Sequence, residues 1–305
     1  MTFPALPNEL YYAIVQHADM PTLYALSLSS RFFSQEAIRT LYRVMDNIKP
    51  AVQIGFLRTM ISSHRLASLV HTYSNVGGFS LLESEQAETF LSLLPRALEN
   101  MVSLKHLMTW TGLDPDLSQS PAGYSFSLQS IKYTSTTSKD LLIHFLNTQP
   151  SLKHIGVPWV GLNDVDPSDP EFACCRSLES VHGNWPVLRA LLPGRRIQCA
   201  TWEEDCYNEG KSGAIFDLRE QGALKDALGG LKAMKLKFSS WKPEFLPSLI
   251  ESLSSVETLE IDLSRGDFNV SKRLLAVSRP FLCLNYVWCQ RLSHSSKTAF
   301  QNSRG

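Results

Sequence analysis

A short apolar pattern recurs through most of this 305-residue chain, at intervals of about 25 residues. In a typical row the first, fourth and sixth positions are apolar, as in Leu231, Met234 and Leu236. Such regular spacing is typical of a repeated structural unit. The gap between the fourth and fifth rows covers about two periods. The rows begin at Leu104, Leu128, Leu152, Leu178, Leu231, Val256 and Phe281.

Weaker rows are predicted at Ile197–Trp202 and near Val70 and Tyr73. Between the rows lie helical patterns, in two of which Pro95 and Pro243 fit best as first-turn residues. Alternation of strand, turn and helix predicts a parallel sheet with helices packed against it. The predicted helices cover 84–94, 95–100, 138–147, 185–192 and 243–253.

If the rows are strands, their third, fifth and seventh side chains lie on the face opposite the apolar positions. A wide open face suits a protein ligand better than a small molecule, and aromatic side chains dominate the energetics of protein interfaces. Lys235 and Lys237 are expected to pair with Glu260 and Asp262 on the next strand. The candidate target-binding residues are therefore His106, Trp110, Lys132, His154, Trp159 and His182.

The first 45 residues have a different pattern, which predicts three short helices. Asn8 is the expected cap of the first helix, Asp19 caps the second with Pro21 in its first turn, and the third begins near Ser34 and includes Met45. Three helices of this length cannot bury all their apolar side chains among themselves. We therefore expect some of them to face a partner or the rest of the chain.

The same N-terminal segment contains a set of motif residues, namely Leu6-Pro7, Glu9-Leu10, Ile14, Leu23, Leu26, Leu28, Ser30-Arg31, Phe33 and Leu41-Tyr42-Arg43. On these residues it resembles the F-box family. The resemblance covers about residues 4 to 45, although Ala18 stands where a larger aliphatic residue is usual and Ser29 where Val is common. In that family the helices dock on the Skp adaptor of SCF-type ubiquitin ligases. Carried over, the adaptor contacts are Leu6, Pro7, Leu10, Ile14, Leu23, Leu26 and Leu28.

The rows that follow resemble degenerate leucine-rich repeats, and the combination is similar to fungal F-box proteins. The expected fold is therefore α+β overall, with a three-helix F-box domain at 1–48. An irregular α/β leucine-rich-repeat-like solenoid with a parallel sheet would then cover 49–305. A different α/β fold built from strand and helix units of similar length is the alternative.

The composition excludes several classes of function. The chain has 29 basic and 29 acidic residues, so its overall charge favours neither nucleic acid nor an anionic membrane. No signal peptide or membrane span is predicted, which indicates an intracellular protein, cytoplasmic or nuclear or both. In such a compartment the six cysteines are expected to be free thiols, and their spacing suits no zinc site.

Signatures of nucleotide, zinc and acyl-transfer chemistry are missing from the sequence. Glu203 and Glu204 belong to its densest acidic cluster, which is expected to form a solvated loop. We therefore expect a protein without enzymatic activity, cofactor or metal.

The resemblance implies a substrate-recognition subunit of an SCF-type ubiquitin ligase. Its partners would be the Skp adaptor, through it a cullin-RING ligase, and an unknown target protein. The alternative is a leucine-rich protein-binding scaffold or inhibitor that is not linked to ubiquitination.

Overall fold

Three helices open the chain in this computed structural model. They are α1 (Asn8–His17), α2 (Met20–Ser29) and α3 (Arg31–Arg43). The structure describes residues 7–46, 50–75, 84–110, 124–134, 144–157, 175–203, 222–238, 253 and 255–263.

Capping residues determine where these helices begin. Asp19 Oδ1 accepts a hydrogen bond of 3.0 Å from the Thr22 N–H, and Pro21 lies in the first turn of α2, as predicted. The prediction of Asn8 as a cap is wrong, because α1 begins at Asn8 itself after Pro7. The predicted start of α3 near Ser34 is also wrong. Ser30 has an extended backbone and its hydroxyl accepts the Phe33 N–H, so the helix begins at Arg31.

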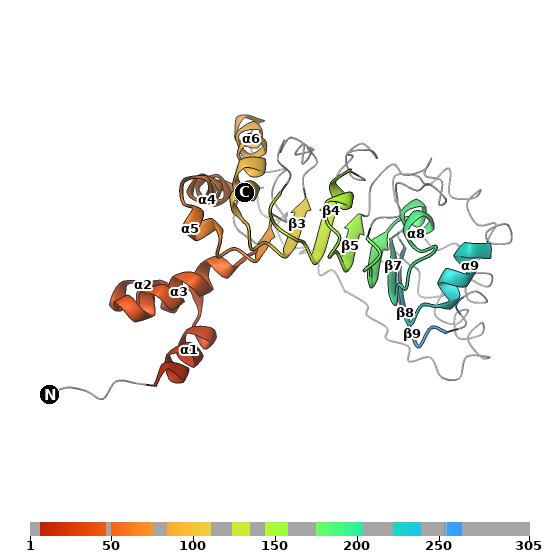
Figure 1. Cartoon of the computed structure of the whole chain (residues 1–305), viewed down its shortest axis with the longest axis horizontal. Coiled ribbons are helices and arrows are strands. Elements are labelled where there is room, and N and C mark those ends of the chain that lie inside the picture. Colours follow the sequence, from red (N-terminus) through yellow and green to blue (C-terminus); the bar gives the residue numbers. More distant parts are fainter. Residues whose placement is uncertain are drawn as a thin grey trace, which may run out of the picture.

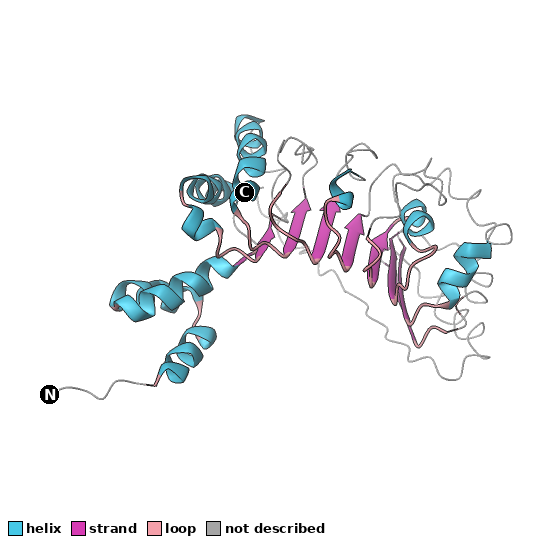
Figure 2. Cartoon of the chain, viewed as in Figure 1, coloured by secondary structure: helices cyan, strands magenta, loops and turns pink. Residues whose placement is uncertain are grey.

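The α3 helix leads directly into a parallel sheet, which has nine strands within the described residues, arranged in the order of the chain. Figure 1 shows the three helices at the β1 end of this sheet, and Figure 2 shows the strands side by side in one curved row. The strands within the described residues are β1 (Val44–Met45), β2 (Thr72–Ser74), β3 (His106–Trp110), β4 (Ser130–Thr134), β5 (His154–Val157), β6 (Ser180–Gly183), β7 (Cys199–Glu203), β8 (Ala233–Phe238) and β9 (Thr258–Leu263).

The two weak rows are confirmed as strands β2 and β7, whereas the row at Phe281 lies outside the described residues. Strand β1 was not predicted, and the assignment of Met45 to a helix is wrong. The backbone leaves the helix at Val44 because residues 44 and 45 pair with Thr72 and Tyr73. The predicted domain boundary at residue 48 therefore follows the first strand of the sheet.

The two faces of the sheet differ as the alternating pattern predicts. The first, fourth and sixth residues of the rows from Leu104 to Val256 are buried, whereas the residues between them are exposed or half-buried except for Gly156. The buried side chains form one core with residues of the covering helices. One face of the sheet is thus packed against helices, and we call the opposite one the open face.

Within the described residues, the helices that follow β1 are α4 (Pro50–Ser62), α5 (His64–Ala67), α6 (Ser84–Asn100), α8 (Trp185–Leu191) and α9 (Gly222–Gly229). Residues 144–147 are also helical. The prediction that Pro95 begins a separate helix is wrong, because α6 continues through it. Leu94 before Pro95 and Leu98 after it are buried in the same core. This packing offsets the hydrogen bond that proline cannot donate.

No helix that the structure describes is long and apolar enough to cross a membrane. Pro243 and its expected helix lie outside the described residues, apart from Leu253.

Candidate functional site

Helix α1 has apolar side chains on both of its sides, and the described part of the chain covers only one of them. Val15 is buried, and Tyr11 packs against the rings of Phe32 and Phe33 on α3, with centroids 4.7 and 4.8 Å apart. Leu10 and Ile14 are one helical turn apart and therefore lie on one side of the helix. Both are exposed, Leu10 by 48%. They form the first of two exposed apolar stripes.

Helix α2 forms the second stripe, at the same four-residue spacing. Met20, Tyr24 and Leu28 all lie along one line of the helix surface, and Leu28 is 73% exposed. On its other side Leu23 is buried against Val15 and Ala37, with Leu26 half-buried beside them. A helix that is apolar all round is normally covered all round. Within the described residues, the chain itself covers only one side of α2.

The predicted adaptor contacts fall into three groups. Pro7, Leu10, Ile14 and Leu28 are exposed and accessible to a partner. Leu26 is half-buried and Leu23 is 4% exposed, so Leu23 holds the three helices together. Leu6 lies outside the described residues. Tyr24 and Met20 were not predicted, although their spacing from Leu28 could have identified them.

Four of the predicted target-binding residues lie on the open face of the sheet. His106 and His154 are exposed and stand in the same register position of β3 and β5, with Ser130 between them. Lys132 and His182 flank Gly156, where an added Cβ would lie 3.1 Å from Lys132 Cγ and 3.7 Å from His182 Nδ1. Gly156 therefore lets these two long side chains fold over β5. Trp110 is the last residue of β3, and Trp159 lies outside the described residues.

Charged side chains are interlinked on the open face of β6 to β9. His182 Nε2 lies 2.6 Å from Glu203 Oε2, and Lys237 Nζ lies 3.4 Å from the same oxygen. The hydrogen bond from His182, with the charge of Lys237, lowers the pKa of Glu203 from 4.5 to about 2 against the opposing effect of burial. Glu203 thus remains a carboxylate at neutral pH. The prediction that it lies in a solvated loop is wrong, because it is the last residue of β7.

The predicted pairs between β8 and β9 are half right. Lys235 forms an ion pair with Glu260, as expected. Lys237 stands opposite Asp262 in the register but donates to Glu203 instead. Most of the charged side chains on the open face of β7 to β9 are therefore paired with one another. The open face near β3 to β5 has more side chains available to a partner.

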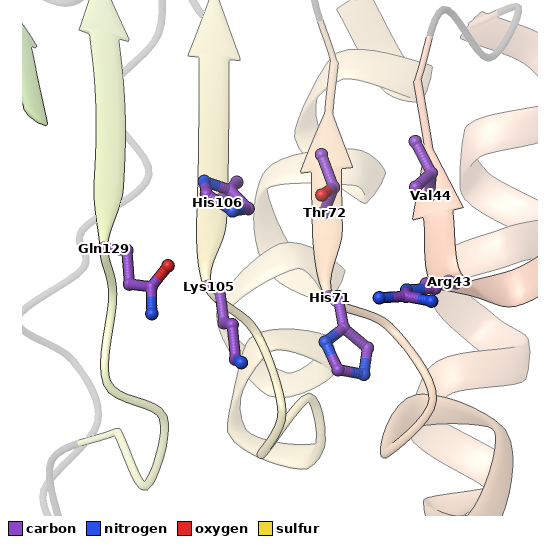
Figure 3. Close-up of a pocket in the computed structure, with 7 residues that line it drawn as sticks. All are labelled: Arg43, Val44, His71, Thr72, Lys105, His106 and Gln129. Atoms are coloured by element: carbon purple, nitrogen blue, oxygen red, sulfur yellow. The ribbon is translucent and has the colours of Figure 1, made fainter.

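A separate pocket lies where strands β1 to β4 begin. Its volume is about 610 Å³, and Arg43, Val44, His71, Thr72, Lys105, His106 and Gln129 line it. Figure 3 shows Arg43, His71, Lys105 and Gln129 in one row before the strands, with the other three residues further along them. Apart from His106, none of these was predicted as a site residue. The signal would have been the polar residue immediately before each strand.

Searching models of known protein families found no match, and no curated protein matches the sequence. Within the part of the chain that the structure describes, no group of three His, Cys, Asp or Glu side chains could hold a metal ion.

Proposed function

We propose that the chain is a substrate-recognition subunit of an SCF-type ubiquitin ligase, which binds the Skp adaptor through α1 and α2. The observation that carries this proposal is the exposure of both apolar stripes, Leu10–Ile14 and Met20–Tyr24–Leu28. Clustered exposed apolar side chains mark surfaces that a partner covers. Four of the predicted adaptor contacts, Pro7, Leu10, Ile14 and Leu28, are exposed.

The mechanism would be one of proximity. The three helices lie at one end of the sheet, so an adaptor bound to them leaves the open face of the later strands accessible (Figure 1). A target held on that face has a high effective concentration near the ligase. No covalent step on this chain is needed. The side chains available for the target include His106, Lys132 and His154.

Titration of the full chain with purified Skp adaptor tests the proposal. Replacing Leu10 and Leu28 with Asp places two carboxylates at the centre of the proposed interface, where water is excluded. We expect the affinity to fall by at least about 30-fold, because truncation of an interface hot spot costs about 2 kcal/mol or more. Both side chains are exposed, so the variant should retain its midpoint of thermal unfolding.

Val102→Asp is the matched control. Val102 is 49% exposed, close to the exposure of Leu10, but it lies in the turn before β3. This variant should bind the adaptor like the wild type. Absence of adaptor binding by the wild-type chain at micromolar concentration would overturn the proposal and favour a scaffold or inhibitor without a ligase. Equal losses in both variants would also contradict it.

A further inference from the structure

The beginnings of the first strands bring basic side chains close together. The His71 N–H donates to the Arg43 carbonyl at 2.9 Å, and the Lys105 N–H donates to the His71 carbonyl at 2.9 Å. The Gln129 N–H in turn donates to Lys105 at 2.8 Å. Neighbouring parallel strands are about 4.8 Å apart. These residues therefore form one row along the edge of the sheet at which the strands begin. Figure 3 shows all four side chains at this edge.

Among the described residues that line it, the pocket has many hydrogen-bond donors and no acidic side chain. Arg43, Lys105, both histidines, the Gln129 amide and the Thr72 hydroxyl can all donate. Among the described residues, no carboxylate forms an ion pair with Arg43 or Lys105. Further along the same edge, Lys153 is paired with Glu179 at 2.8 Å. In the described part of the chain, Lys153 is therefore compensated by a carboxylate, whereas Arg43 and Lys105 in the pocket are not.

The like charges in the pocket repel one another. The pKa of His71 is lowered by burial and by the charges of Arg43 at the end of α3, Lys105 immediately before β3 and His106 at the start of β3. Protonation of His71 is thus disfavoured in the empty pocket. A dianion between these side chains would reverse the effect, because it favours the charged imidazolium.

We propose that this pocket binds a phosphate monoester. Phosphate oxygens accept several hydrogen bonds at once, and the Arg43 guanidinium can donate two of them side by side. A cavity of about 610 Å³ exceeds the size of one phosphate group, so it has room for the molecule that bears the group. Val44 supplies an apolar wall for that molecule. The phosphate comes either from a phosphorylated side chain of a protein or from a small metabolite.

Isothermal titration of the full chain distinguishes these sources. The probes are inorganic phosphate, a phosphoserine peptide and the same peptide without phosphate. We expect saturable binding of phosphate, and no binding of the unphosphorylated peptide. Tighter binding of the phosphopeptide than of phosphate supports the site and assigns it to proteins, whereas equal affinity supports it and assigns it to small phosphate compounds. If neither phosphate nor phosphopeptide binds at millimolar concentration, the inference is overturned.

Replacing Arg43 and Lys105 with Gln removes two charges and retains hydrogen-bonding side chains of similar length. The affinity for the bound probe should fall at least about 30-fold, since hydrogen bonds to charged groups are the strong ones. The control replaces Arg96 on α6 and Lys225 on α9 with Gln, because both are exposed and outside the pocket. An equal loss in the control would mean diffuse attraction and would overturn the inference.

The dependence on pH tests the part played by His71. Sulfate serves as the probe because its charge is constant near neutrality, unlike that of a phosphate monoester. Its affinity should rise as the pH falls from about 8 to about 6, and His71→Gln should flatten this rise. An unchanged rise in His71→Gln would contradict the role of His71. The Leu10 and Leu28 double variant should lose adaptor binding but retain phosphate binding. The test of the proposed function and the test of this pocket can therefore fail independently.

Discussion

Glu203 shows how one side chain links three strands on the open face. It extends from β7 between His182 on β6 and Lys237 on β8. Because it is ionised more readily in the folded chain than in the unfolded chain, the unfolded chain binds more protons at acidic pH. Glu203 therefore stabilises the fold above about pH 5, and this contribution is lost as the pH falls toward 2.

Replacing Glu203 with Gln tests this role. We expect the free energy of unfolding at neutral pH to fall by about 1 kcal/mol, since the charge-assisted hydrogen bonds are lost. The variant should also lose less stability than the wild type between about pH 5 and pH 2. Urea unfolding at a series of pH values measures both effects. Glu257→Gln, at an exposed position, is the control. Parallel pH profiles for wild type and Glu203→Gln would contradict the account.

At the scale of elements, the contact between α8 and β6 depends on a glycine. Gly183 ends β6 on the packed face, and a Cβ added there would lie 2.6 Å from Val187 Cγ1 on α8. Asn184 caps α8 immediately afterwards, since its side chain accepts the Val187 N–H. The strand therefore turns into the helix with no space for a side chain at Gly183.

Gly183→Ala should lower the free energy of unfolding by about 1–3 kcal/mol, because overpacking displaces α8 from the sheet. Gly55→Ala is the control, since Gly55 lies within α4 and an added Cβ would meet no atom within 4 Å. That change should stabilise the chain by about 0.5–1 kcal/mol. Denaturant unfolding compares the two. Equal stabilities of Gly183→Ala and the wild type would show that α8 can move at no cost.

Helices and strands could be predicted from the sequence where the local residue pattern and the tertiary packing favour the same structure. The apolar rows define the strands because each buried position recurs within its row, as Ile131 and Tyr133 do after Leu128. Strand β1 was not predictable because its two residues are set by pairing with Thr72 and Tyr73, which lie far along the chain. The continuity of α6 through Pro95 likewise depends on tertiary packing.

The residues of the candidate sites could be predicted less well than the helices and strands. The resemblance to the F-box family implied Leu10, Leu23 and Leu28 alike as partner contacts, because a sequence motif does not tell a core residue such as Leu23 from an exposed one. The pocket at Arg43 and Lys105 depends on strand register, which the sequence of a single row does not contain.

At the scale of the whole molecule, the three N-terminal helices and the sheet with its open face form one continuous structure. Helix α3 continues into β1, and β1 pairs with β2, so the N-terminal helices are joined to the sheet by a strand. A partner bound to α1 and α2 would therefore stay at the β1 end of the sheet. The central claim is that such a partner covers the two apolar stripes.

Hydroxyl-radical footprinting of the full chain, with and without Skp adaptor, tests this claim most directly. The account predicts that oxidation of Leu10, Ile14, Met20, Tyr24 and Leu28 falls when the adaptor is added. Oxidation of Leu23 should be low in both states because it is already buried, and that of Val102 should not change. Unchanged oxidation of both stripes at a saturating adaptor concentration would contradict the account.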